Sequence, residues 1–302
     1  ITGGAFTPRT SQYLEQVVLY FKKRGYRFVS LDDLYVMFRE NKVIKKFVAV
    51  TFDDGYLDNL THALPVLKKH EVPFTVYVST NFPNRTAILW WDLLEEVLLA
   101  EDKMEFSVNG TQYSFDSAGM EQKEAAFQEI RSIITGFSRE EFLNNIRTVF
   151  SGKIGDIYQK TRELALSWEQ VTELSKDPLV TIGAHTLNHY ALKHLTDEEA
   201  EREINESKTE IENHIDKQVD HFAYPFGGPL EVSQRDVETV KKAGFKTATA
   251  TVEGNIFREH KDHLLFLPRL QVSGHEQHME LELFIDGLNQ FRYNKFDKVF
   301  RV

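Results

Sequence analysis

The 302-residue sequence predicts an α/β fold built around a parallel sheet. Segments with helical spacing alternate with short apolar segments along most of the chain, which is typical of repeated βα units. The apolar segments are continuous rather than alternating, as in strands that are covered on both faces. Several of them end in polar residues or glycine. Units repeated over this length form either a barrel or an open, doubly wound sheet.

The first third of the chain predicts a helix, a strand, a second helix and then a complete βαβ unit. Gly25 ends the first helix, because glycine is common just past helix C-termini. Ser30 is the expected N-cap of the second helix. The expected elements are a helix at 13–26, a strand and a helix within 27–38, a strand at 46–54, a helix at 58–72 and a strand at 73–80.

Residues 84–165 interrupt this rhythm. They predict an apolar helix at 88–101, a hairpin at 106–115 with an Asn-Gly turn, and charged helices to about residue 161. We interpret them as an insertion within a single domain that spans residues 1–302. Its position after the second strand of the βαβ unit would let it cover the mouth of a barrel.

The βα rhythm resumes after the insertion. Ser167 is the expected N-cap of the next helix. The remaining expected elements are helices at 167–177, 196–215 and 233–245, with strands at 179–186, 221–228, 246–252 and 264–272.

Composition excludes several classes of protein. The net charge is −10, from 36 basic and 46 acidic residues, and no basic block is present, so we expect no nucleic-acid partner and no anionic membrane partner. No apolar run is long enough to span a membrane. The chain has no cysteine, so any metal must be bound by His, Asp or Glu. We expect a cytoplasmic protein, with an exported one as the alternative if a leader was removed.

Polar residues follow the predicted strands at their C-terminal ends. In βα folds the chemistry collects at this edge of the sheet, so these residues are expected to form one site. They are Asp53 and Asp54, His185 and His189, the run Tyr224, Pro225, Phe226 and Gly227, and Arg269.

The paired aspartates and the two histidines favour a metal centre. Adjacent carboxylates repel each other, and a cation beside them relieves this. His185 and His189 are four residues apart, so a helical turn or a tight loop would aim both rings at one point. Two histidines and a carboxylate are a common three-ligand set for Zn²⁺ or another divalent ion. The alternatives are two solvated loop histidines and a turn or N-cap role for the aspartates.

These motifs resemble those of a known family. TFDDG at 51–55 and HTLNH at 185–189 are similar to the first two motifs of the polysaccharide deacetylases with the NodB homology domain, carbohydrate esterase family 4. YPFG at 224–227 resembles the core of the third motif. The similarity runs from about Lys46 to Val272, outside the insertion.

The resemblance implies a distorted (β/α) barrel of about seven strands, with the insertion after the second βα strand. It implies a hydrolase that removes an acetyl group, N-acetyl or O-acetyl, from a sugar or glycan with the help of a divalent metal, for which we expect Zn²⁺. Carried over by position, Asp53 is the catalytic base, and Asp54, His185 and His189 are the metal ligands. A backbone N–H near Phe226 would stabilise the oxyanion.

The sequence departs from the family pattern at two points. Many members have an arginine that orients the base two residues before the proline of the third motif, and here Ala223 stands there. Arg269 could reach the same aspartate from a later strand, or be an ordinary surface arginine. The fifth motif supplies a histidine as general acid, and no clean match to it is present. Its candidates are His260, His263, His275 and His278.

The aromatic run in the insertion also has two interpretations. Trp90 and Trp91 either pack in the core or stack on a sugar ring, and Asp92 is either a cap or a site residue. Two other functions stay open on the sequence alone. One is hydrolysis of other C–N bonds on the same fold, and the other is carbohydrate binding without turnover.

Overall fold

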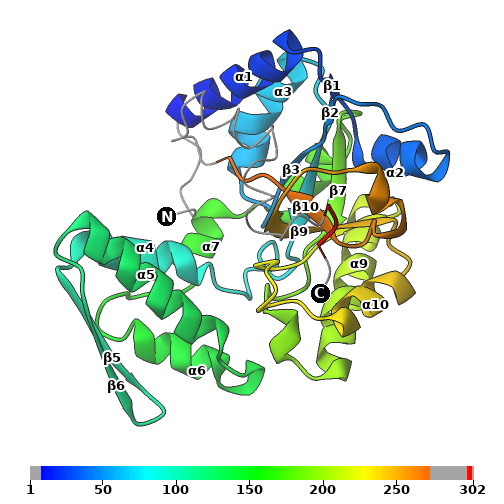
Figure 1. Cartoon of the computed structure of the whole chain (residues 1–302). Helices are drawn as coiled ribbons and strands as arrows, with labels where there is room; N and C mark the ends of the chain where they lie inside the picture. The colour runs from blue at the N-terminus through cyan, green and yellow to red at the C-terminus, as the bar shows by residue number, and fades with distance from the viewer. Residues whose placement is uncertain (1–7, 273–297, 301–302) are drawn as a thin grey trace.

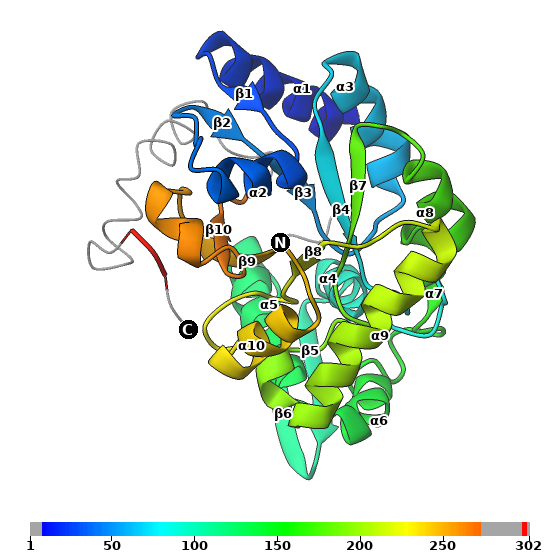
Figure 2. The same ribbon diagram turned by 90° about the vertical axis from the view of Figure 1, so that its right-hand side faces the viewer.

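The computed structural model describes residues 8–272 and 298–300. Its centre is a parallel sheet in the order β10-β9-β8-β7-β4-β3, which curls into an incomplete barrel with helices outside it (Figure 1, Figure 2). The predicted fold class, a distorted (β/α) barrel, is therefore confirmed. The described part of the sheet has six strands where about seven were expected. They are β3 (Val50–Phe52), β4 (Phe74–Val78), β7 (Val180–Ala184), β8 (His221–Ala223), β9 (Thr247–Glu253) and β10 (Leu267–Arg269).

The helices divide into a set that packs around the sheet and a set that forms a lobe beside it (Figure 1). The first set is α1 (Pro8–Lys23), α2 (Leu31–Arg39), α3 (Leu64–Lys69), α8 (Trp168–Leu174), α9 (Asp197–Ile215) and α10 (Gln234–Lys242), with the short helices η1 (Asn59–Ala63), η2 (Leu192–His194) and η3 (Arg258–Asp262). We call residues 90–164 the helical lobe. It consists of α4 (Trp90–Ala100), the hairpin β5 (Lys103–Val108) and β6 (Thr111–Asp116), α5 (Met120–Thr135), α6 (Arg139–Val149) and α7 (Gln159–Leu164).

Local sequence sets the helix boundaries, largely as expected. Ser30 and Ser167 both accept a hydrogen bond from the backbone three residues ahead and form capping boxes at the starts of α2 and α8. Gly25 follows α1 with φ of +75°, a backbone conformation that favours glycine. The Asn109-Gly110 pair forms the hairpin turn, and both residues have positive φ as a type I′ turn requires.

Two expected elements are interrupted in the structure, and the strands expected at 221–228 and 264–272 are shorter, because β8 ends at Ala223 and β10 spans Leu267–Arg269. The single strand expected at 46–54 is divided at Ala49, because β2 (Phe47–Val48) pairs with the two-residue β1 (Arg27–Phe28) while β3 pairs with β4. The helix expected at 58–72 begins as the π-helical turn η1, and α-helical structure starts only at Leu64. Pro65 has no amide hydrogen, so it cannot donate the backbone bond that a regular α-helix would need there.

The two largest hydrophobic cores among the described residues lie in the barrel and in the helical lobe. Val76, Ile182 and Phe222 belong to the core of the barrel, which the strands share with α3, α8, α9 and α10. The helical lobe has its own core, in which Leu94 of α4 and Met104 of β5 are fully buried. None of the helices in the described ranges has the length and apolarity needed to cross a bilayer.

Candidate functional site

A cavity of about 1120 Å³ includes the C-terminal ends of the strands, where the helical lobe borders it, and continues along the N-terminal segment that contains α1, β1 and β2. Most of the polar residues predicted from the strand ends meet here. Asp53, Asp54, His185, His189 and Arg269 all line it, although they are up to 216 residues apart in sequence.

The aspartate pair lies in a sharp turn directly after β3. Asp54 has φ of +70°, and Gly55 follows with the same value. Gly55 also donates its amide hydrogen to the carbonyl of Asp53 at 2.9 Å. Glycine suits this position because of its left-handed backbone conformation, since a β-carbon there would make only ordinary contact with Val78 at 3.4 Å. The turn directs the Asp54 carboxylate toward the histidines.

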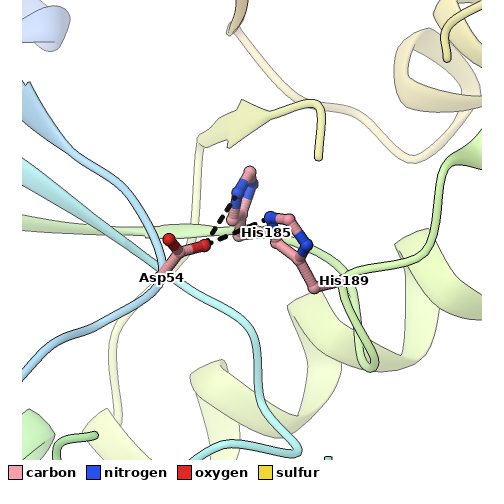
Figure 3. A group of neighbouring side chains, drawn as sticks. All are labelled: Asp54, His185 and His189. Atoms are coloured by element: carbon pink, nitrogen blue, oxygen red, sulfur yellow. Dashed lines mark ion pairs between the residues drawn. The ribbon is translucent and has the colours of Figure 1, made fainter. Parts of the chain in front are cut away.

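His185 and His189 lie in a tight loop that follows β7, not on a helix. Thr186 and His189 both have left-handed φ, +67° and +59°. The Thr186 hydroxyl closes the loop by accepting the amide hydrogen of His189 at 3.0 Å. The Nε2 atoms of His185 and His189 point at Asp54 Oδ1, at 3.5 and 3.2 Å (Figure 3).

Asp54, His185 and His189 have the chemistry and the convergence of a divalent metal site. One ligand atom from each lies within 4.8 Å of the others. The Nδ1 of His185 donates to the Ala223 carbonyl at 2.7 Å, so Nε2 is the ring nitrogen that is available to a metal. Burial alone would raise the pKa of Asp54, but the two imidazoles hold it well below its usual value. A carboxylate and two imidazoles in this arrangement fit Zn²⁺.

Asp53 forms a separate, bidentate ion pair beside this group. Arg269 donates to both of its carboxylate oxygens at 2.6 Å, and it is itself fixed by a bond from Nε to the Ala250 carbonyl at 2.9 Å. Burial opposes ionisation of Asp53, but the guanidinium holds the pKa of the carboxyl below its ordinary value. The hypothesised contact between Arg269 and this aspartate is present, and an ordinary surface arginine would not be bound in this way.

Comparison with known proteins decides the family. The family model described as "Polysaccharide deacetylase" matches residues 40–248, more than half of the chain. The chain belongs to the polysaccharide deacetylase family. Membership makes it a carbohydrate deacetylase, as the sequence predicted. No curated protein sequence matched the chain.

Solved structures with deacetylase names share the fold. The deacetylase PplD of Streptococcus pyogenes is 17% identical with a TM-score of 0.59, and the alignment covers 93% of each chain. The BpsB deacetylase domain of Bordetella bronchiseptica is 14% identical with a TM-score of 0.54, over 84% of this chain and 82% of that one. A de-N-acetylase from Aggregatibacter actinomycetemcomitans is 16% identical with a TM-score of 0.53, over 93% and 92%. These similarities extend the fold assignment to almost the whole chain.

The family's third motif is only partly turned toward the cavity in this deacetylase. Phe226 lines the cavity and has φ of +59°. Tyr224 is fully buried, and its hydroxyl donates to the Leu265 carbonyl at 2.8 Å. Gly227 has φ of +62°, and a β-carbon there would lie 2.5 Å from the Thr251 amide nitrogen. These residues and Pro225 therefore shape the loop that presents Phe226, and the oxyanion role stays a prediction.

The candidates for the general acid do not reach the cavity in the described structure. His260 is fully buried, and its Nδ1 accepts the amide hydrogen of Phe257 at 3.0 Å. Neither His260 nor His263 is among the described residues that line the cavity. His275 and His278 lie outside the described residues.

A hydrogen-bonded group joins Trp91 and Asp92, both considered above as possible site residues, to Tyr56, which the sequence reasoning missed. Tyr56 donates its hydroxyl hydrogen to Asp92 Oδ2 at 2.6 Å and accepts one from Trp91 Nε1 at 2.6 Å. Asp92 is 6% exposed, and burial raises its pKa to about 7. The Trp91 ring lies 4.7 Å from the ring of His189. The signal for Asp92 in the sequence was an acidic residue directly after two tryptophans at the start of a largely apolar helical segment.

The helical lobe supplies the opposite wall of the cavity. Trp90 is buried in the lobe core yet also lines the cavity, so the tryptophans are core and cavity residues at once. Phe127, Gln128 and Arg131 reach the same space from one face of α5. The Arg131 guanidinium lies 5.2 Å above the ring of Phe226. In the sequence, the i, i+4 spacing of Phe127 and Arg131 indicated that both lie on the same face of a helix.

Proposed function

We propose that this deacetylase removes an N-acetyl group from a sugar within a glycan, with a divalent metal held by Asp54, His185 and His189 and with Asp53 as the general base. The observation that carries the proposal is the position of the three-ligand group beside a second carboxylate that Arg269 keeps ionised. Deacetylases of this family are generally metal-dependent, which agrees with this donor set.

The metal ligands and Asp53 have different roles in the proposed reaction. A bound Zn²⁺ ion would supply a Lewis acid for the acetyl carbonyl and lower the pKa of water toward neutrality. Asp53 has to accept a proton from the attacking water. It can do so at neutral pH because its ion pair with Arg269 keeps it in the carboxylate form. The same bidentate contact fixes the direction of the carboxylate, so the proton acceptor is already oriented before substrate enters.

The apolar side of the cavity fits a sugar substrate. Trp91 and Phe226 are partly exposed, and the ring of His189 lies 4.7 Å from each of theirs. Aromatic side chains of this kind can cover the apolar face of a pyranose or the acetyl methyl group. Asp53 and the ligand group line the same cavity, where the amide of the sugar would be cleaved.

One specific observation favours a second candidate, a carbohydrate-binding protein without turnover. Apart from His185 and His189, no histidine lines the described part of the cavity, so proton delivery to the departing amine has no imidazole there. Hydrolysis of other C–N bonds on this fold would be detected by offering amide substrates without a sugar beside the N-acetylated sugars.

Metal content and acetate release test the proposal together. We expect about one Zn²⁺ per chain by elemental analysis, acetate release from N-acetylated oligosaccharides, and loss of that release after treatment with a chelator. Metal binding without release from any acetylated sugar would favour the binding protein. A protein that takes up no divalent ion would contradict the proposed metal centre.

Two substitutions separate the proposed roles. Asp53→Asn should keep the metal but lower kcat by roughly 10²- to 10⁴-fold, because it removes the base without removing a ligand. His185→Ala should lose the metal itself, measured by elemental analysis after dialysis. Near-normal deacetylation by Asp53→Asn would show that another group takes the proton.

A further inference from the structure

The loop that joins the two proposed histidine ligands is held from outside by a buried glutamate on α9. Glu203 is 2% exposed. Its Oε2 accepts the amide hydrogens of Leu187 at 3.0 Å and Asn188 at 2.8 Å, and its Oε1 accepts from Asn188 Nδ2 at 2.6 Å. A buried carboxylate is costly unless hydrogen bonds replace its water, and here these three donors come from the residues between His185 and His189.

Glu203 is also the end of a chain of asparagine side chains. Asn188 Oδ1 accepts from Asn81 Nδ2 at 2.7 Å, and Asn81 Oδ1 accepts from Asn84 Nδ2 at 3.1 Å. Asn84 Oδ1 in turn accepts from Trp168 Nε1 at 2.7 Å. An ionised carboxylate only accepts and an indole nitrogen only donates, so the two ends fix the direction of each amide between them.

The loop conformation needs this support. Thr186 and His189 both have left-handed backbone conformations, and for a β-branched residue such as Thr186 this conformation is strained. Two further backbone bonds restrain the loop, from Thr80 to the Thr186 carbonyl at 3.1 Å and from Asn81 to the Leu187 carbonyl at 2.9 Å. The direction of His189 therefore depends on groups that surround the loop and do not themselves reach the metal position.

We propose that Glu203 is a positioning residue that sets the metal affinity of the site, through Asn188 and the directed chain of amides. The inference rests on the proposed metal centre. It adds that the ligand geometry is fixed before the ion binds, by a carboxylate on a helix outside the cavity.

Glu203→Gln is the direct test, because it keeps the size of the side chain but replaces one of its two acceptor oxygens with an NH₂ donor. Either orientation of the new amide places an NH₂ group against the backbone N–H groups of residues 187 and 188 or against Asn188 Nδ2. We expect Zn²⁺ affinity, measured by competition with a chromophoric chelator, to fall about tenfold. The control is Glu206→Gln, the same change at a half-exposed position one turn further along α9, which should bind Zn²⁺ like the wild type.

A compensating substitution distinguishes positioning from general stability. Asn81→Asp alone places a carboxylate against Asn188 Oδ1, so it too should weaken Zn²⁺ binding several-fold. Combined with Glu203→Gln, it allows the chain to reverse: the new carboxylate accepts from Asn188 Nδ2, and Asn188 Oδ1 accepts from the new amide. The double variant should regain Zn²⁺ affinity to within about threefold of the wild type.

The outcomes separate this inference from the proposed function. If the wild type binds Zn²⁺ and folded Glu203→Gln binds it with the same affinity, only the positioning role is overturned. Losses of affinity in the double variant that are simply additive would overturn it too. If Glu203→Gln does not fold, unchanged affinity in Asn81→Asp would overturn it. A wild-type chain that binds no Zn²⁺ would instead overturn the proposed metal centre. Circular dichroism and the Tm of each metal-free variant show that the compared proteins are folded.

Discussion

The two walls of the cavity are built on different principles. The barrel wall carries the proposed base and metal ligands, and hydrogen bonds to neighbouring strands fix Arg269 and His185 there. The helical lobe presents Trp90, Phe127 and Arg131 from a unit with its own hydrophobic core. A rigid sheet edge suits groups that must be placed within fractions of an ångström. A separately packed unit can change its cavity face without disturbing that geometry, so we expect reaction chemistry from the barrel and substrate selection from the lobe.

The largest expected effect is on the barrel wall, at Arg269. Arg269→Gln removes the positive charge and the bidentate hydrogen bonds that hold Asp53. We therefore expect kcat to fall about a hundredfold or more while bound metal is retained. The pKa of Asp53 should also rise toward or above its ordinary value, because burial would no longer be opposed by the guanidinium. The measurements are kcat as a function of pH and the metal content.

Arg269→Lys is the matched variant, since it keeps the charge but loses the bidentate geometry. It should lose about tenfold in kcat, less than Arg269→Gln. Equal losses in the two variants would mean that geometry alone matters. Unchanged kcat in both would break the assignment of chemistry to this wall.

A second, smaller effect is expected where the two walls meet, at Asp92. Its pKa is raised to about 7 from an ordinary value of 3.8, so the folded protein holds this proton over a range where the unfolded chain has released it. Asp92 therefore lowers the free energy of unfolding as pH rises from about 4 to about 7, by about 2 to 4 kcal/mol. In Asp92→Asn this part of the pH dependence should disappear, so the variant gains stability relative to the wild type at pH 8.

Urea unfolding of metal-free wild type and Asp92→Asn at pH 5 and pH 8 measures this difference. Comparing the two proteins cancels the contribution of other groups, including buried His260, whose pKa is lowered to about 4 and whose effect has the opposite sign. The same pH dependence in both proteins would show that Asp92 is ionised in the fold at neutral pH.

The two walls also differ in how far sequence could predict them. Asp53, Asp54 and both histidines were predicted to share a site because each follows a predicted strand, and the ends of parallel strands meet at one edge. The division of the first strand at Ala49 was not predicted, because it depends on which neighbour each half pairs with. Tertiary packing decides such pairings, whereas the local pattern of apolar residues is the same in both cases.

The residues of the lobe wall, and the contacts between the two walls, could not be predicted from local sequence patterns either, because they too depend on tertiary packing. The contact of Tyr56 with Asp92 joins residues 36 apart, and the contact of Arg131 with Phe226 joins the helical lobe to the loop that follows β8. Apolar residues at helical spacing indicate a buried face but do not say whether a cavity borders it. Only the fold as a whole turns one face of α5 toward the barrel mouth.

The smallest expected effect tests the lobe wall directly, at Arg131. Its guanidinium lies over Phe226 and within 3.8 Å of Glu231, and it is partly exposed at the cavity. Arg131→Gln should raise KM about three- to fivefold and leave kcat and metal content unchanged. The cation–π contact, worth about 1 kcal/mol, holds the Phe226 ring that we expect to cover the sugar, and this ring acts on bound substrate and transition state alike. Arg147→Gln, an exposed arginine on α6 of the same lobe, is the control and should alter neither constant. A fall in kcat with unchanged KM would mean that Arg131 acts in the transition state, and the division of chemistry and selection between the two walls would then be wrong.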